Sequence, residues 1–416
     1  MKILKLSPYY YPEQVSSSHL TDDLNEAFIE SGFVQENFVP MPSRGISDDV
    51  RSEYKDKKNE ILNNGYIIVH RFPMIREGKN TIHRAIKYIL TNIVQYHKGI
   101  CAKDIDVVYS GSTPPTQGLL CGKVAKVLSK RYGHKVPFVY NLQDVFPDSL
   151  VNAKMTKKGS LIWKLGRKIE DSTYRYADKI ITISDEFKTN IMSKGVPEEK
   201  IVVVPNWVNT DNVYPVDRKD NILFNRYNLD RDLFYICYSG NIGHSQNMDL
   251  LLEVAKEIDL PDVRFVLIGD GAAKESVQKR IDEEHICNVI MLPFQDYSEI
   301  AYVFSLGDVG LVISKPGVGG SSVPSKTYSI MAAGRPVLAS FDEDSELCKL
   351  INKVGCGVIA DAKSKEQLVS AIRQLHEDNL SSFGNNGRLY VTNTLNKDNC
   401  TKIYVNTIKN SCLEVR

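Results

Sequence analysis

The sequence lacks a hydrophobic run long enough to cross a membrane. No stretch reaches the roughly 18 apolar residues that a spanning helix needs. Its start, MKILKLSPYYYP, places polar residues and proline where a secretory signal would continue its apolar segment. We therefore expect the protein to stay in the cytoplasm.

The eight cysteines include no C-x-x-C pair, and they lie at positions 101, 121, 237, 287, 348, 356, 400 and 412. This scatter predicts reduced core residues and not a disulfide or zinc framework. The net charge is only +1, so the chain has no general attraction for nucleic acid, and we expect no nucleic-acid partner. Low-complexity tracts and short internal repeats are also missing.

What is present is typical of a globular α/β protein. Hydrophobic residues make up 42% and charged residues 25% of a 416-residue chain, which exceeds what one core usually supports. Apolar strands such as DVVYSG and VRFVLIG alternate with amphipathic helices in both halves, a pattern that predicts mainly parallel sheets covered on both faces. We expect two doubly wound, Rossmann-like domains with a ligand cleft at the carboxyl ends of their strands.

The charged, weakly periodic stretch 213–232 suggests a linker between these domains. We predict an N-terminal domain of residues 1–212, to which residues 395–416 return as a C-terminal helix, and a C-terminal domain of residues 213–394.

Two glycine loops follow strands of the second half. YSGNIGHSQN places Gly240 and Gly243 before a helix, and IGDGAAKES places Gly269 and Gly271 before another. Such loops let backbone N–H groups approach an anion. A tight turn that packs helix on sheet explains each loop equally well.

The stretch SSVPSKTYSIMAAGRPVLA raises the phosphate interpretation. Pro324 and Ser325 are helix-start residues and Gly334 ends the helix, so Lys326 is predicted in the first helical turn. A cation is unfavourable beside the positive end of a helix dipole. A bound diphosphate would compensate it, whereas the alternative is a solvated surface lysine.

Several motifs together resemble the family-four glycosyltransferases, which are retaining enzymes of the GT-B fold. They are SPYYYPE, SGSTPPTQG, NLQDVFPDS, TISDEF, VVVPNWVN, SGNIG, VLIGDG, LPF and VPSKTYSIMAAGRPVLAS. The match runs across nearly the whole chain in order, and the most similar branch contains bacterial N-acetylfucosamine-type transferases of O-antigen and capsule assembly.

The resemblance implies that the second domain binds a nucleotide sugar and the first an acceptor. The implied donor-binding residues are Gly240, Asn241, Gly243, Gln246, Asp270, Gly271, Pro293, Phe294, Ser325, Lys326 and Tyr328. In the first domain, Ser17, Ser18 and His19 stand where relatives meet the donor phosphates, and Asp144 would face the acceptor. We expect Lys326, Asp144 and His19 to act in catalysis.

The chain departs from the family pattern in two places, around the helix and after the first glycine loop. Many relatives carry two glutamates around this helix, where this chain has Ser321 and Ser329. Relatives also often place Arg and Lys after the first glycine loop, whereas this chain has Asn241, His244 and Gln246. Lys326 is the nearest replacement cation.

The mechanism we expect is front-face transfer, in which the leaving diphosphate helps take the acceptor proton, because no triad order or spaced carboxylate pair demands a double displacement. The D-x-D segments at 104–106, 230–232 and 342–344 are better explained as loop charge than as metal ligands. We predict no metal and no cofactor beyond the nucleotide-sugar substrate.

The substrates implied are a UDP-sugar, such as a UDP-linked N-acetylated deoxyhexosamine (N-acetylfucosamine), and a lipid-linked saccharide. Residues 74–100 hold five Lys or Arg against one Glu, and residues 154–179 hold eight against three acidic residues. Basic amphipathic helices suit the anionic inner face of the cytoplasmic membrane, although ordinary surface helices look similar.

Three other functions share parts of this pattern. A non-hydrolysing UDP-sugar epimerase has the same two-domain build and would need no acceptor. An NAD-dependent oxidoreductase is disfavoured because neither glycine loop has the full G-x-G-x-x-G spacing. A non-catalytic sugar-binding module would bind without turnover.

Overall fold

The computed structural model describes residues 1–13, 18–77, 81–152, 156–317 and 323–414. It divides into two compact units, Met1–Pro205 with Thr401–Arg416 and Asn206–Cys400. The boundaries lie several residues from those predicted, at 205 and 400 instead of 212 and 394. Helix α16 (Lys397–Leu413) begins in the second unit and ends in the first.

The first unit contains an eight-stranded sheet in the order β3-β4-β2-β1-β5-β6-β7-β8. All neighbours are parallel except β3 and β4, so β3 forms an antiparallel edge. The strands are β1 Lys2–Leu6, β2 Val34–Pro40, β3 Asn59–Leu62, β4 Ile67–Phe72, β5 Val107–Gly111, β6 Phe138–Leu142, β7 Lys179–Thr182 and β8 Ile201–Val203.

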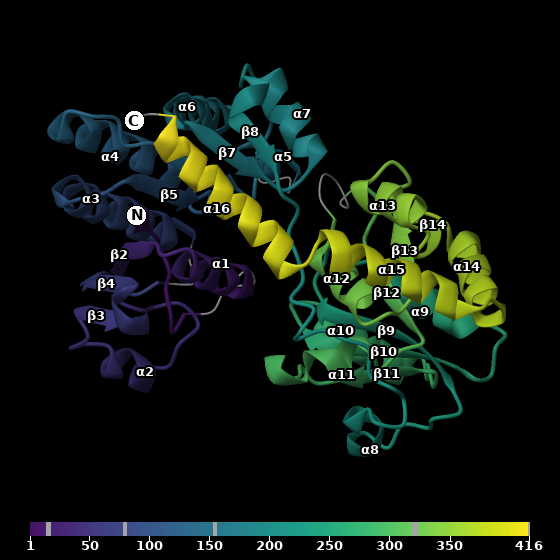
Figure 1. Ribbon diagram of the computed structural model, residues 1–416. Coiled ribbons are helices and arrows are strands. Elements are labelled where there is room, and N and C mark those ends of the chain that lie inside the picture. The colour runs from purple at the N-terminus through teal and green to yellow at the C-terminus, as the bar shows by residue number, and fades with distance from the viewer. Residues whose placement is uncertain (14–17, 78–80, 153–155, 318–322, 415–416) are drawn as a thin grey trace. The chain divides into compact units, whose positions relative to one another are not determined.

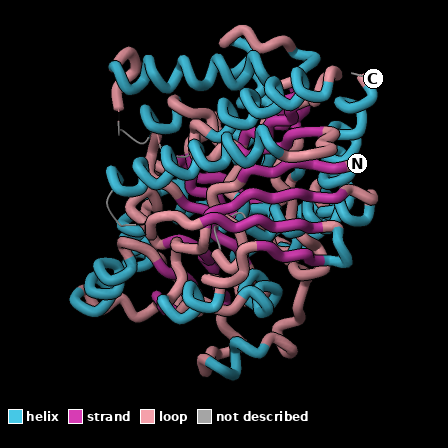
Figure 2. The backbone as a smooth tube through the Cα atoms, turned by 90° about the vertical axis from the view of Figure 1, so that its left-hand side faces the viewer, coloured by secondary structure: helices cyan, strands magenta, loops and turns pink. Residues whose placement is uncertain are grey.

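Helices connect the strands of this sheet and cover it, as Figures 1 and 2 show. They are α1 Ser18–Glu30, α2 Asp48–Glu53, α3 Thr81–Cys101, α4 Gln117–Tyr132, α5 Asp148–Asn152, α6 Leu161–Tyr176 and α7 Asp185–Ser193, with short 3-10 turns at Asn63–Gly65 and Glu198–Lys200. None of the helices in the described part of the chain is both long and apolar enough to cross a membrane.

The second unit contains a six-stranded, fully parallel sheet in the order β11-β10-β9-β12-β13-β14. Its strands are β9 Phe234–Asn241, β10 Val263–Asp270, β11 Val289–Leu292, β12 Val309–Ile313, β13 Val337–Phe341 and β14 Gly357–Asp361. Its helices are α8 Ile222–Arg226, α9 Met248–Glu257, α10 Lys274–Glu283, α11 Ile300–Phe304, α12 Ser325–Ala332, α13 Glu346–Val354, α14 Lys365–Glu377 and α15 Leu380–Thr394, with a 3-10 turn at Tyr297–Glu299.

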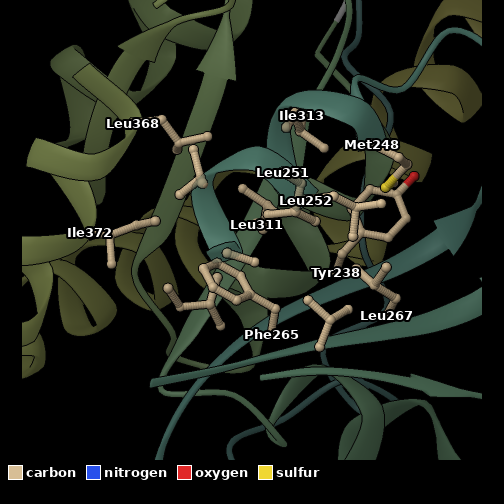
Figure 3. Close-up of a cluster of buried hydrophobic side chains, with 14 of the residues drawn as sticks. Tyr238, Met248, Leu251, Leu252, Phe265, Leu267, Leu311, Ile313, Leu368 and Ile372 are labelled. Carbon is tan, nitrogen blue, oxygen red and sulfur yellow. The ribbon is translucent and has the colours of Figure 1, made fainter. Parts of the chain in front are cut away.

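The core of the second unit follows from its uninterrupted apolar strands. Strands that are buried on both faces read as continuous hydrophobic runs, as in VRFVLIG of β10. Phe265 and Leu267 of β10 pack with Leu251 of α9 and Leu368 of α14, and all four are buried (Figure 3). The predicted fold, two doubly wound α/β units with mainly parallel sheets, is confirmed.

Two sequence-based expectations were wrong. Residues 213–232 are not a free linker, because Leu223 and Phe224 of α8 are buried in a core cluster with β9 and β10. The side chain of Arg218 also pairs with Asp308. The charges between its apolar residues hid this packing, since the segment has no clear hydrophobic period. The second error concerns Cys101 and Cys287, which are exposed, while the other six cysteines are buried and all eight are free thiols.

Helix α12, which carries Lys326, is held on the sheet by close contacts. A Cβ atom at Gly310 of β12 would lie 2.5 Å from side-chain atoms of Ile330 on α12. Just beyond the end of the helix, a Cβ atom at Gly384 of α15 would lie 2.1 Å from the carbonyl oxygen of Gly334. Glycine at both positions therefore allows β12 and α15 to fix the helix closely.

We predict that Gly310→Ala destabilises the second unit by about 1–3 kcal/mol, because the added methyl overpacks the contact with Ile330. Gly111→Ala is the matched control, since Gly111 also lies in a parallel strand but has open space around its Cβ position. That variant should change stability by no more than about 0.5 kcal/mol. Urea unfolding of both variants checks this, and equal midpoints would contradict it.

Candidate donor and acceptor sites

The two glycine loops of the second unit lie side by side at the carboxyl edge of its sheet. Gly240 of β9 pairs with Gly269 of β10. A Cβ atom at Gly269 would lie 1.9 Å from the carbonyl oxygen of Gly240, and one at Gly271 would lie 2.4 Å from that of Ile242. The close approach of the two loops thus requires Gly269 and Gly271 whether or not a ligand binds.

The first loop is closed by its own side chains. The backbone N–H of Gly243 donates to Gln246 Oε1 at 3.1 Å, so Gln246 shapes the loop and occupies this donor. The N–H of Lys315, which follows β12, donates to the carbonyl of Ser245 at 2.8 Å and ties the loop to the neighbouring strand. The side chain of Asn241 is exposed at the edge.

Lys326 reaches this edge from the first turn of α12, as predicted. Its Nζ atom lies 3.7 Å from the centroid of the Tyr238 ring, a cation–π contact. A Cβ atom at Gly240 would lie 3.0 Å from the same Nζ atom, so the glycine leaves room for the ammonium group. Tyr238 is itself fixed, since it is buried and its hydroxyl donates to the carbonyl of Asn241 at 2.6 Å.

Burial lowers the pKa of Lys326 from 10.5 to about 7. Among the described residues, no carboxylate pairs with this ammonium group to offset the cost of desolvation. The charged lysine lowers the free energy of unfolding, and this destabilisation is fully present below about pH 7, where the lysine is charged in both the folded and the unfolded state. It declines as the pH rises from there toward 10.5, because the lysine is then neutral in the folded state. A bound anion would reverse the shift and favour the charged form.

Tyr328 does not join Lys326. Residues two positions apart on a helix point to nearly opposite sides, and Tyr328 is only 5% exposed. Burial raises the pKa of its hydroxyl, with smaller effects of the nearby Tyr390 and Cys400. Ser325, in contrast, is exposed at the start of the helix.

The loop after β11 presents Pro293 and Phe294 to solvent, with Phe294 72% exposed. Gln295 anchors this loop, since its Nε2 donates to the carbonyl of Pro293 at 2.5 Å and to the hydroxyl of Tyr227 at 2.8 Å. The exposed aromatic ring therefore stands on a fixed backbone.

A cavity of about 840 Å³ opens beside Asp270 and Gly271. The residues that line it are Asp270, Gly271, Ala272, Lys274, Glu275, Gln278, Lys279, Asp282 and Glu283. Carboxylates outnumber lysines here, so this cavity suits hydroxyl groups better than phosphates.

The predicted residues of the first unit lie after its strands. Ser18 and His19 begin α1, which follows β1, while Ser17 lies outside the described residues. Asp144 follows β6, and its pKa is raised by desolvation, an effect that a hydrogen bond with Ser149 partly offsets. All three described residues are thus at the carboxyl edge of the first sheet.

Two features were missed from the sequence. Tyr238 looked like an ordinary strand residue, although its position two residues before Gly240 places it on the same side of β9. A cluster of charged residues after β1, β2 and β4 was also missed, because its members are far apart in the chain. No group of three or more His, Cys, Asp or Glu side chains in the described ranges is arranged to hold a metal ion.

Comparison with known proteins places both units among glycosyltransferases. Residues 42–212 match the model of Glycosyltransferase Family 4, and residues 219–390 match that of Glycosyl transferases group 1. The first matched region lies mostly in the first unit and extends past its end at Pro205 to residue 212, and the second lies within the second unit.

Two curated relatives cover most of the chain. A protein of Escherichia coli named as a colanic acid biosynthesis glycosyl transferase, WcaI, is 28% identical over 70% of this chain and 72% of its own length. A protein of Pseudomonas aeruginosa named as a glycosyltransferase, WbjE, is 29% identical over 67% of this chain and 68% of its own length. Among solved structures, Anabaena HepE in complex with UDP has a TM-score of 0.72 at 13% identity and covers 99% of this chain and 100% of that one. At 13% identity, the similarity to HepE shows a shared fold and nothing more.

Proposed function

We propose that this chain, of which two regions match the models of Glycosyltransferase Family 4 and Glycosyl transferases group 1, moves a sugar from a UDP-sugar to a lipid-linked saccharide. The transfer would take place during assembly of a surface polysaccharide such as O-antigen or capsule. The sugar we propose is an N-acetylated deoxyhexosamine such as N-acetylfucosamine. Relatives named for colanic acid biosynthesis and as glycosyltransferases support the polysaccharide context. A panel of UDP-sugars, read out by product mass, tests the choice of donor.

Lys326 carries the donor assignment. It is a half-buried lysine whose desolvated ammonium group has no carboxylate partner among the described residues, it lies at the start of a helix, and it stands beside a glycine loop. The helix dipole and the desolvation cost both disfavour an isolated cation there. A diphosphate would neutralise the ammonium and also lie at the positive end of the helix dipole.

In this proposal the sugar is transferred on the face that the diphosphate leaves, with retention of configuration and without a metal ion. The leaving phosphate oxygen takes the proton of the acceptor hydroxyl, the new glycosidic bond forms at the anomeric carbon, and UDP departs. Charge grows on the diphosphate in the transition state, where Lys326 would stabilise it. In the first unit, Asp144 is proposed to orient the acceptor or act as its base, and His19 to meet the donor phosphates.

We predict that Lys326→Ala loses a charge-assisted contact of about 1.5–3 kcal/mol, which is roughly a 10-fold to 150-fold loss. The loss should fall more on turnover than on binding of free UDP, because the charge is greatest in the transition state. Lys353→Ala, at an exposed lysine of α13, is the control and should retain full activity.

The assay measures transfer from a UDP-sugar to a lipid-linked saccharide, with and without a chelator, which should leave the rate unchanged. Turnover of a folded Lys326→Ala protein within a factor of about two of the natural protein would remove Lys326 from the site. Conversion of the UDP-sugar without any acceptor would instead indicate an epimerase.

The membrane part of the proposal rests on two helices of the first unit. Helices α3 and α6 expose large apolar side chains next to their basic residues, and these are Ile86, Ile89, Leu90 and Ile93 on α3 and Leu161, Ile162 and Leu165 on α6. Exposed apolar side chains rimmed by basic residues suit an anionic bilayer surface. We propose that the protein acts at the inner face of the cytoplasmic membrane through these helices.

We predict that the protein binds phosphatidylglycerol vesicles at low salt, and that replacing Ile89, Ile93 and Leu165 together by serine weakens this binding at least about tenfold, because apolar area no longer enters the bilayer. Ile61→Ser is the control, since Ile61 is 75% exposed on the edge strand β3. Vesicle co-sedimentation measures both. Equal binding of the triple variant would contradict the role of these helices.

A further inference from the structure

A cluster of cationic side chains lies at the carboxyl edge of the first sheet. Tyr9 follows β1, Arg44 follows β2 and Glu77 follows β4, while Arg84 and Lys87 lie one turn apart on α3. Four separate elements therefore bring their polar side chains to one place. Ligands of doubly wound folds bind at this edge.

Glu77 is the centre of the cluster. Its Oε2 atom accepts hydrogen bonds from the Tyr9 hydroxyl at 2.7 Å and from Lys87 Nζ at 2.9 Å. Its Oε1 atom faces Arg84 Nε at 3.4 Å and Arg44 Nε at 3.9 Å. Hydrogen bonds and attraction from these cations lower the pKa of Glu77 against the opposing effect of burial. A single carboxylate thus pairs with three cations.

A second carboxylate, Glu13, does not balance the charge. Its Oε1 atom accepts the backbone N–H groups of Ser43 and Arg44, each at 2.7 Å, so it holds the loop after β2. Even when Glu13 is counted, cations exceed carboxylates by three to two among the described residues of the cluster. The side chains of Arg44 and Arg84 are 43% and 38% exposed, so the excess positive charge faces solvent.

The frame behind the two arginines is rigid. Lys87 is fully buried and donates to Ser43 Oγ at 2.7 Å in addition to Glu77. The guanidinium of Arg44 lies 5.0 Å from the centroid of the Tyr9 ring, and the Tyr9 hydroxyl is 2.7 Å from that of Tyr88. Side chains fixed in this way present their outer N–H groups without a large loss of entropy on binding.

We propose that Arg44 and Arg84 form a binding site for an oxyanion carried by the acceptor, either the diphosphate that joins the saccharide to its lipid or the carboxylate of an acidic sugar. The planar, forked donors of arginine match both groups. The assignment of the anion to the acceptor rests on the proposed transferase function, whereas binding of the anion at this site does not.

The test titrates inorganic pyrophosphate, and separately glucuronate, into the full-length Lys326→Ala protein, in which anion binding by the second unit is weakened. Adding Arg84→Gln or Arg44→Gln to this protein should weaken binding at least about tenfold, because a charge-assisted contact is lost. Arg84→Lys should give an intermediate affinity, since it keeps the charge and loses the fork. Arg76→Gln is the matched control, because Arg76 is 50% exposed nearby and pairs with Asp48.

Tight binding of pyrophosphate alone would identify a phosphate group, and tight binding of glucuronate alone an acidic sugar. The proposal is overturned if neither probe binds, or if the arginine variants keep both their thermal stability and the affinity of the parent. UDP binding to the natural protein is measured in parallel and should be unchanged by Arg84→Gln. Absence of UDP binding, with arginine-dependent pyrophosphate binding retained, would reject the donor assignment and leave this site standing.

Discussion

The donor site depends on a half-buried ammonium group that has no carboxylate partner among the described residues. Lys326 stacks on Tyr238, which is fixed by its bond to the Asn241 carbonyl, and burial keeps the pKa of the lysine near 7. A fold tolerates such an unfavourable charge when function needs it. The glycines that allow α12 and the two loops to pack closely therefore hold this ammonium group in place.

The two units position their cationic side chains through different contacts. In the second unit, one lysine at a helix start faces a glycine loop whose Gly243 N–H is already occupied by Gln246. In the first unit, two arginines are positioned by a buried lysine and a shared glutamate. The first arrangement favours binding that strengthens as charge develops on a leaving group, whereas the second favours constant recognition of a charged group by planar donors.

The sequence allowed the fold and part of the donor site to be predicted. Alternating apolar runs and amphipathic helices are local signals, so both sheets and the helix that begins at Ser325 could be read directly. The direction of Tyr328 could not be foreseen until α12 was seated against β12 and α15. The role of Gln246 and the buried packing of Phe224 depend on tertiary contacts. The cluster around Glu77 joins residues from four elements, so no local sequence pattern predicts this cluster.

The most direct measurement is the pKa of Lys326 itself, followed by the ¹³C chemical shift of its ε-methylene group in lysine-labelled protein, with the Lys326→Met variant to assign the signal. The account predicts a pKa close to 7 in the free protein and an increase of at least about one unit when UDP binds, because the diphosphate favours the charged form. A value near 10.5 in the free protein, or a value that UDP leaves unchanged, would contradict the claim that this lysine holds the donor diphosphate.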